Sequence, residues 1–394
     1  MDLFPGEELS FQMPDYSNIK MSDEEINEKY RAGDIRIVTE QARYPLNTIS
    51  SMVDSDSYKM NPEYQRRHRW DNRRRSGLIE SLIMNVPVPP VFLYEFDYSC
   101  YEVMDGLQRL TAIGSFYKDE FALEGLTKWP ELNGKKYTEL PKLVRQGIDR
   151  RYISSIILLH ETAKTQEEAD RLKQMVFDRI NSGGEKLTPQ EKRNANFDGK
   201  LNRLCIKLSS HEALCKTWGI PVDDKSSDNS IHSDRASNKL FKTMTDVELV
   251  LRFFAFRQRS YLQKGSLEDY LDMYLKNGNY FSAEVLSGLE KCFLRTIDLA
   301  YDLFEEKAFF LYRYRKTGWG WFERPTTAVY DPLMYALSDH LDKRDKLLKQ
   351  KDKINEDLVD FYANNYNDFE GRNTNQSALL SRQNKFLDFI ASYV

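Results

Sequence analysis

The chain has 394 residues, 41% hydrophobic and 30% charged, so it can bury a core and has room for two or three domains. Its net charge of −4 argues against a protein that coats nucleic acid with a generally basic surface. Its four cysteines form no CxxC pair, and no apolar run is long enough to span a membrane. We therefore expect a cytoplasmic protein with reduced cysteines and no membrane partner.

The first half of the chain alternates between helix and strand patterns. A polar leader over residues 1–35 contains a short helix near Asp23–Tyr30. Strands are expected over Val91–Glu95, Tyr101–Met104 and Ile153–Leu159, the first two of them as a hairpin. Helices are expected after the N-cap Asp71, over Leu107–Tyr117 and over Gln166–Ile180.

Helix patterns dominate the second half of the chain. Thr188, Pro189 and Glu191 make the sharpest helix start, and apolar stripes predict further helices over Asp246–Phe256, Glu284–Glu306 and Asp352–Tyr362. The polar, serine-rich residues 221–238 are expected to form an exposed loop. The resulting fold class is α+β, with an α+β domain over 36–200 followed by an all-helical domain over 201–394.

The motif DGLQR lies where a strand is expected to end and a helix to begin. Unpaired backbone N–H groups and the helix dipole favour an anion at such a junction. Gly106 lets backbone approach a ligand, while Gln108 and Arg109 can reach back to it. Asp105 is a candidate ligand for Mg²⁺ or could orient a water. The plainer interpretation is an Asp-Gly turn with Arg109 in a surface ion pair.

A second polar cluster, QRRHRW, precedes the helix expected after Asp71. Its arginines carry the planar fork that binds phosphate, and Trp70 could stack on a base or anchor the core. The run Arg73-Arg74-Arg75 opens the helix at the dipole end that disfavours cations. It is either a solvated face or a contact with DNA.

Two further segments each allow two interpretations. FDRINSGG could bring Arg179, Asn181, Gly183 and Gly184 to a ligand, but the pattern by itself favours a helix C-cap. The aromatic segment Trp319–Leu337 is interpreted as packing rather than as a base-stacking surface.

Four motifs in order resemble the N-terminal domain family of GmrSD-type modification-dependent restriction endonucleases. They are PEYQRRHRW, VPVPPVFLYE, YEVMDGLQRLTAI and VFDRINSGGEKLTPQEKRNA. The resemblance covers Tyr44 to Phe197 and continues more weakly through Thr245–Phe256 and Gln376–Ile390. The sequence departs from the DGQQR pattern at Leu107, which replaces the first glutamine. It also shows no HNH metal-ligand set after Trp319, so self-contained HNH cleavage is not expected.

The resemblance implies a ParB/sulfiredoxin-like domain in bacterial defence that binds and hydrolyses a nucleoside triphosphate. The nucleotide-binding residues it implies are Gln65, Arg66, Arg69, Trp70, Gly106, Thr111, Arg179, Asn181, Gly183 and Gly184. Asp105, Gln108 and Arg109 would be catalytic, with Asp105 also at a Mg²⁺ ion, and Arg73, Arg74 and Arg75 would contact DNA.

Three functions follow from this assignment. In the first, hydrolysis switches a DNA complex or a separate effector or nuclease subunit. Arg66 and Arg109 would clamp the phosphates while Gln108 orients the attacking water. In the second, the pocket is vestigial and the chain is a DNA-sensing or regulatory subunit, which the Leu107 departure favours slightly. In the third, the domain itself nicks DNA.

Overall fold

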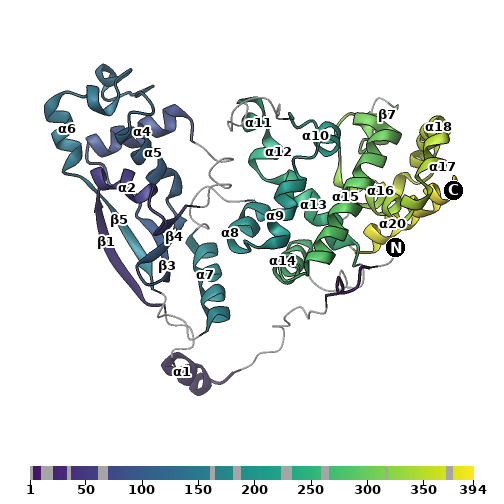
Figure 1. The fold of residues 1–394 in the computed structure, drawn as a ribbon, viewed down its shortest axis with the longest axis horizontal. Coiled ribbons are helices and arrows are strands. Elements are labelled where there is room, and N and C mark those ends of the chain that lie inside the picture. The colour runs from purple at the N-terminus through teal and green to yellow at the C-terminus, as the bar shows by residue number, and fades with distance from the viewer. Residues whose placement is uncertain are drawn as a thin grey trace. The chain divides into compact units, whose positions relative to one another are not determined.

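The computed structural model describes residues 3–9, 21–32, 37–60, 70–159, 165–180, 188–222, 233–258, 266–315, 318–369 and 376–394 (Figure 1). The chain divides into two units. The sheet unit is Tyr16–Leu187, and the helical unit is Met1–Asp15 together with Thr188–Val394. The boundary at Thr188 coincides with the helix start that the sequence marks most sharply.

The sheet unit combines one sheet with short helices. Its elements are α1 (Asp23–Ala32), β1 (Thr39–Pro45), α2 (Ile49–Val53), β2 (Tyr58–Lys59), α4 (Asn72–Ile83), β3 (Val91–Asp97), β4 (Cys100–Asp105), α5 (Leu107–Tyr117), α6 (Lys142–Asp149), β5 (Tyr152–Leu158) and α7 (Gln166–Ile180). The described strands form a five-stranded mixed sheet in the order β1-β5-β3-β4-β2. Neighbours β1 and β5 are antiparallel, as are β3 and β4, whereas β5 runs parallel to β3 and β2 parallel to β4.

The position of each strand follows from its residues. β5 is rich in isoleucine and lies between two partners, where Ile153, Ser155 and Ile157 are buried at alternate positions. β3 and β4 form the expected hairpin, and Ser99 in its turn adopts φ 55°. The central position of β3 and β4 carries the end of β4, and with it the DGLQR motif, to the start of α5.

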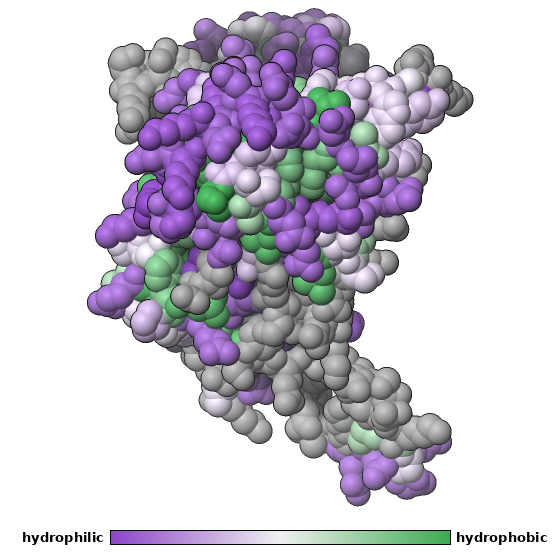
Figure 2. All heavy atoms as spheres, turned by 90° about the vertical axis from the view of Figure 1, so that its right-hand side faces the viewer, coloured by the Kyte–Doolittle hydropathy of each residue, from purple (hydrophilic) through white to green (hydrophobic). Residues whose placement is uncertain are grey.

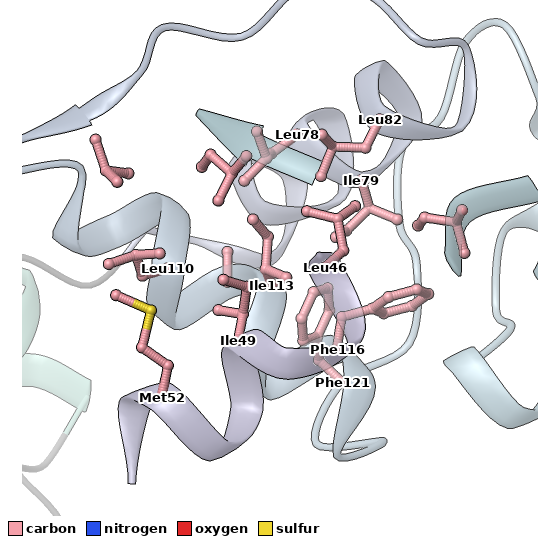
Figure 3. Close-up of a cluster of buried hydrophobic side chains, with 14 of the residues drawn as sticks. Leu46, Ile49, Met52, Leu78, Ile79, Leu82, Leu110, Ile113, Phe116 and Phe121 are labelled. Atoms are coloured by element: carbon pink, nitrogen blue, oxygen red, sulfur yellow. The ribbon is translucent and has the colours of Figure 1, made fainter. Parts of the chain in front are cut away.

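One hydrophobic cluster holds the helices of this unit together. Figure 3 shows its side chains converging from α2 and the turn before it, from α4 and from α5. Leu46, Ile49, Ile79, Leu110, Ile113 and Phe116 are all fully buried. Burial of each such apolar side chain stabilises the fold by roughly 1.5–3 kcal/mol. The Asp71 carboxylate caps α4 by accepting from the Arg74 N–H at 2.8 Å, so this helix begins where the sequence predicts.

The helical unit contains helices and one hairpin. Its elements are α8 (Pro189–Asn196), α9 (Lys200–Leu208), α10 (Glu212–Trp218), α11 (Ser233–Ser237), α12 (Lys239–Lys242), α13 (Thr245–Phe256), α14 (Leu267–Gly278), α15 (Ala283–Phe304), β6 (Leu311–Arg315), β7 (Gly318–Phe322), α16 (Thr327–Asp339), α17 (Arg344–Lys349), α18 (Lys351–Asn364), α19 (Tyr366–Phe369) and α20 (Gln376–Ala391). The face shown in Figure 2 is largely hydrophilic, with small hydrophobic patches between the polar residues. The expected fold class, an α+β domain followed by a helical region, is confirmed.

Three details differ from the sequence-based expectations. The C-terminal region is not all-helical, because residues 311–322 pair as the hairpin β6–β7. The expected loop 221–238 contains α11, whose Arg235 is buried over the ring of Phe241. The leader is not uniformly a solvated segment either, because residues 3–9 pack within the helical unit, where the Glu7 carboxylate pairs with Arg257.

None of the helices in the described part of the chain combines the length and apolar character needed to cross a bilayer.

Candidate nucleotide site

The site is built on the corner between β4 and α5. Gly106 forms this corner with φ 96°, a backbone conformation that favours glycine. A Cβ at this position would lie 2.5 Å from Cγ1 of Val91 and 2.9 Å from Nη2 of Arg109. The corner therefore requires glycine for two reasons, the positive φ of its backbone and the close approach of Val91 on β3.

An ion pair spans this corner. Nη2 of Arg109 donates to Oδ2 of Asp105 at 2.7 Å and to the backbone carbonyl of Pro90 at 3.2 Å. The Arg109 side chain is 15% exposed and the Asp105 side chain 36%. Nε of Arg109 is buried and has no hydrogen-bond partner among the described residues. A buried guanidinium with an unused donor is a group that an oxyanion can satisfy.

The QRRHRW cluster ends beside the DGLQR corner. The backbone N–H of Trp70 donates to Oε1 of Gln108 at 3.2 Å, although the two residues are 38 positions apart. Trp70 is half-buried against the core cluster, and the Arg74 guanidinium lies 6.0 Å from its ring centroid. Trp70 and the DGLQR corner are thus joined by a direct hydrogen bond.

A small cavity opens along the polar side of α5. Its volume is about 220 Å³, and its polar lining comes from Arg75, Gln108, Thr111, Ser115, Lys118 and Glu120. The Thr111 hydroxyl is buried without a hydrogen-bond partner in the described part of the chain. Lys118 pairs with Asp54 at 2.7 Å. The cavity thus has room for a small polar group.

The three consecutive arginines at the start of α4 have different surroundings. Arg73 is exposed, and its Nε lies 3.6 Å from Glu124. Arg74 is exposed near Trp70, whereas Arg75 is half-buried over Phe121 and lines the cavity. Arg73 and Arg74 therefore remain the better candidates for contact with DNA, while Arg75 faces the interior.

Most of the remaining predicted site residues lie outside the part of the chain that the structure describes. Gln65, Arg66, Arg69, Asn181, Gly183 and Gly184 lie outside the described residues. Arg179 is exposed in the last turn of α7. The structure thus brings together Trp70, Asp105, Gly106, Gln108, Arg109 and Thr111.

The donor set at the corner does not form a resident metal site. Asp105 is a single carboxylate bonded to Arg109, and the described residues contain no group of three His, Cys, Asp or Glu suited to a metal. A Mg²⁺ ion that arrives on a nucleotide needs only one or two protein carboxylates. Asp105 can supply one.

Leu107 departs from the expected motif but does not open a gap in the site. Its side chain is 8% exposed and belongs to the buried core. At this position the chain uses a packing residue, so the polar contacts of the corner come from Gln108 and Arg109.

Sequence reasoning missed several residues of the site. The Pro90 carbonyl fixes Arg109, and Ser115 and Lys118 extend the lining of the cavity. The spacing of Gln108, Thr111, Ser115 and Lys118 could have revealed the second group, because these residues recur on one face of a helix. The Pro90 contact gives no local signal, since it depends on how β3 and α5 meet.

A comparison with protein families matches the same part of the chain. Residues 49–197 match the family described as the N-terminal domain of the GmrSD restriction endonuclease. The match supports the family that the four motifs predict for this segment. The match extends from α2 to α8 and contains every predicted site residue. Searches of curated proteins and of solved structures gave no match.

Proposed function

We propose that residues 49–197 form the nucleotide-hydrolysing domain of a restriction-type defence protein. In this proposal the nucleotide state switches a complex with DNA or with a separate nuclease subunit. The family match supports the restriction setting. The observation that carries the nucleotide assignment is the largely buried Arg109, which one carboxylate holds in place and whose Nε has no described partner.

Each role follows from a contact at the corner. Arg109 and the first-turn N–H groups of α5 would bind phosphate oxygens, because both carry positive charge that is already in place. Asp105 would face a Mg²⁺ ion carried by the nucleotide. Gln108 is fixed by the Trp70 N–H, and the second lone pair of its Oε1 could accept from the attacking water. That water attacks the γ-phosphorus as the bond to the bridging oxygen breaks, releasing inorganic phosphate.

Phosphate release from each nucleoside triphosphate tests the proposal. The purified full chain with Mg²⁺ should release phosphate, and Arg109→Ala should lower the rate at least about 100-fold, in the range seen when a single transition-state donor is removed. Arg109→Lys should restore little, since an ammonium cannot reproduce the guanidinium fork.

Arg43→Ala is the matched control, because Arg43 is an exposed arginine on β1 of the same unit. Its rate should equal that of the wild type. Phosphate release no faster than in buffer, for every nucleotide tested, would contradict the proposal.

A DNA-sensing subunit without hydrolysis is the second candidate. The Asp105–Arg109 ion pair favours it, because each group neutralises the charge of the other without a nucleotide. The exposed Arg73 and Arg74 would then contact the DNA backbone. DNA affinity in this case falls steeply with salt, is unchanged by nucleotide, and drops in Arg73→Ala/Arg74→Ala but not in Arg43→Ala.

A further inference from the structure

The hairpin β6–β7 presents four aromatic side chains on one face. Tyr312 is opposite Trp321 and Tyr314 is opposite Trp319, so the alternation of side chains along a strand puts all four together. The rings of Tyr312 and Trp319 stack with centroids 5.7 Å apart and planes 14° apart. Trp319 is nevertheless 43% exposed and Tyr314 53% exposed. The segment is therefore only partly the packing element that its sequence suggests.

The other face of the same hairpin carries arginines. Arg313 is opposite Gly320 and Arg315 is opposite Gly318, and a Cβ on either glycine would meet nothing within 4 Å. The two guanidinium carbons lie 4.4 and 4.9 Å from the ring centroid of Phe322. Neither arginine forms an ion pair with any residue that the structure describes.

Exposed rings beside unpaired arginines match the chemistry of single-stranded nucleic acid. Its bases are unstacked and can lie on aromatic rings, and its phosphates are neutralised by arginine. Duplex bases are already stacked on each other and cannot use the rings in this way. Tyr314, Arg315 and Trp319 lie at the turn end of the hairpin, so one strand crossing that end can reach both the rings and the cation.

We propose that the hairpin β6–β7 is a docking site for single-stranded DNA. The site goes beyond the proposed nucleotide function, because it lies in the helical unit and outside residues 49–197. Only the choice of DNA over RNA rests on that function. The stacked Tyr312 holds Trp319 in place before binding, which lowers the entropy that the complex must lose.

Binding of a fluorescent 20-nucleotide oligo(dT) to the full chain, followed by anisotropy, tests the proposal. Trp319→Ala and Tyr314→Ala should each weaken binding about tenfold, the effect of losing one stacked base. Trp319→Phe should stay within about threefold of wild type, because it keeps a ring. Arg315→Ala should reduce the slope of log K against log salt by about 0.7, as expected for one phosphate contact on a single strand.

Two matched variants control for composition and charge. Tyr280→Ala removes a tyrosine that is 86% exposed just after α14, and Lys291→Glu reverses an exposed charge on α15. Tyr280→Ala should leave oligo(dT) affinity unchanged, and Lys291→Glu should change it by less than Arg315→Glu does. Arg109→Ala should also leave it unchanged, which separates this site from the nucleotide site.

Three results would overturn the proposal. The first is that the wild type does not bind oligo(dT). The second is that the hairpin variants bind oligo(dT) as tightly as the wild type, when urea unfolding shows that they are as stable as the wild type. The third is that oligo(U) or duplex DNA binds more tightly than oligo(dT).

Discussion

Single residues set the shape of the corner at Asp105–Arg109. Gly106 has both a positive φ and a neighbouring strand in contact range, while Arg109 is oriented by one carboxylate and one carbonyl. We therefore expect the corner to tolerate few substitutions, because Gly106 contacts Val91 and Arg109 is hydrogen-bonded to Asp105 and Pro90. In the proposed function, this rigidity would present donors to the ligand that are already in position.

Glycine substitutions separate two constraints on Gly106, its positive φ and its close contact with Val91 of β3. Gly106→Ala should lower the free energy of unfolding of the sheet unit by roughly 2–4 kcal/mol, since strain at positive φ adds to the clash with Val91. Urea denaturation measures the loss. Gly134→Ala, with φ 84° but open space around it, should cost only about 1 kcal/mol. Gly147→Ala, within α6 and free of both constraints, should be neutral or stabilising. Equal effects at all three glycines would contradict this account.

At the scale of elements, one carboxylate connects three segments of the sheet unit. Asp149 ends α6 and accepts from the Tyr117 hydroxyl of α5 at 3.0 Å and from the Tyr137 hydroxyl at 2.9 Å. Burial and the bond to Asp149 raise the pKa of Tyr137 to about 12, and the same causes raise the pKa of Tyr117. Both tyrosines therefore hold their protons more tightly in the folded chain than in the unfolded one.

This arrangement predicts a loss of stability at high pH. Unfolded tyrosines titrate near pH 10, so the contribution of Tyr137 is complete below about pH 10 and disappears as the pH rises toward 12. Urea midpoints at pH 9, 10 and 11 should fall for the wild type and fall less for Tyr137→Phe. Asp149→Asn should also flatten the dependence, because it removes the nearby negative charge. Parallel curves for wild type and both variants would show that the cluster does not set this dependence.

At the scale of the whole chain, the N-terminal residues complete the helical unit. The fully buried Glu7 pairs with Arg257 at 2.6 and 2.8 Å, 250 positions away, and its carbonyl accepts from Gln258 at 2.7 Å. The Arg257 guanidinium also lies 4.9 Å from the Phe4 ring centroid, and that ring packs on Gly288 of α15. The chain thus begins in one unit, forms the other and returns.

Removing Glu7 should destabilise the helical unit strongly. Glu7→Ala leaves Arg257 buried and unpaired, so we expect a loss of about 3–5 kcal/mol. Hydrogen exchange should show the lost protection in α13 and α15. Glu8→Ala, at the exposed neighbouring position, should change stability by less than about 0.5 kcal/mol. The double variant Glu7→Leu/Arg257→Met should recover much of the loss. Equal stabilities of Glu7→Ala and Glu8→Ala would contradict the role of the pair.

Local sequence patterns determined several helix starts, the strands β3, β4 and β5, and the resemblance of residues 49–197 to a known domain family. Asp71 and Thr188 cap helices where predicted, because a cap needs only residues within one turn. The β3–β4 hairpin and α5 follow for the same reason, and Gly106 marks the corner that joins them. These features depend on residues close together in the chain and can therefore be predicted from the amino-acid sequence.

Tertiary structure alone decided the long-range contacts. Trp70 with Gln108, Arg109 with the Pro90 carbonyl, and Glu7 with Arg257 join residues 19 to 250 positions apart. The different surroundings of Arg73, Arg74 and Arg75 likewise depend on what packs against each side of α4. The sequence favours packing for the aromatic segment Trp319–Leu337, but the pairing of β7 with β6 leaves Trp319 43% exposed. Burial and pairing are properties of the folded chain, because each depends on segments that the local sequence does not specify.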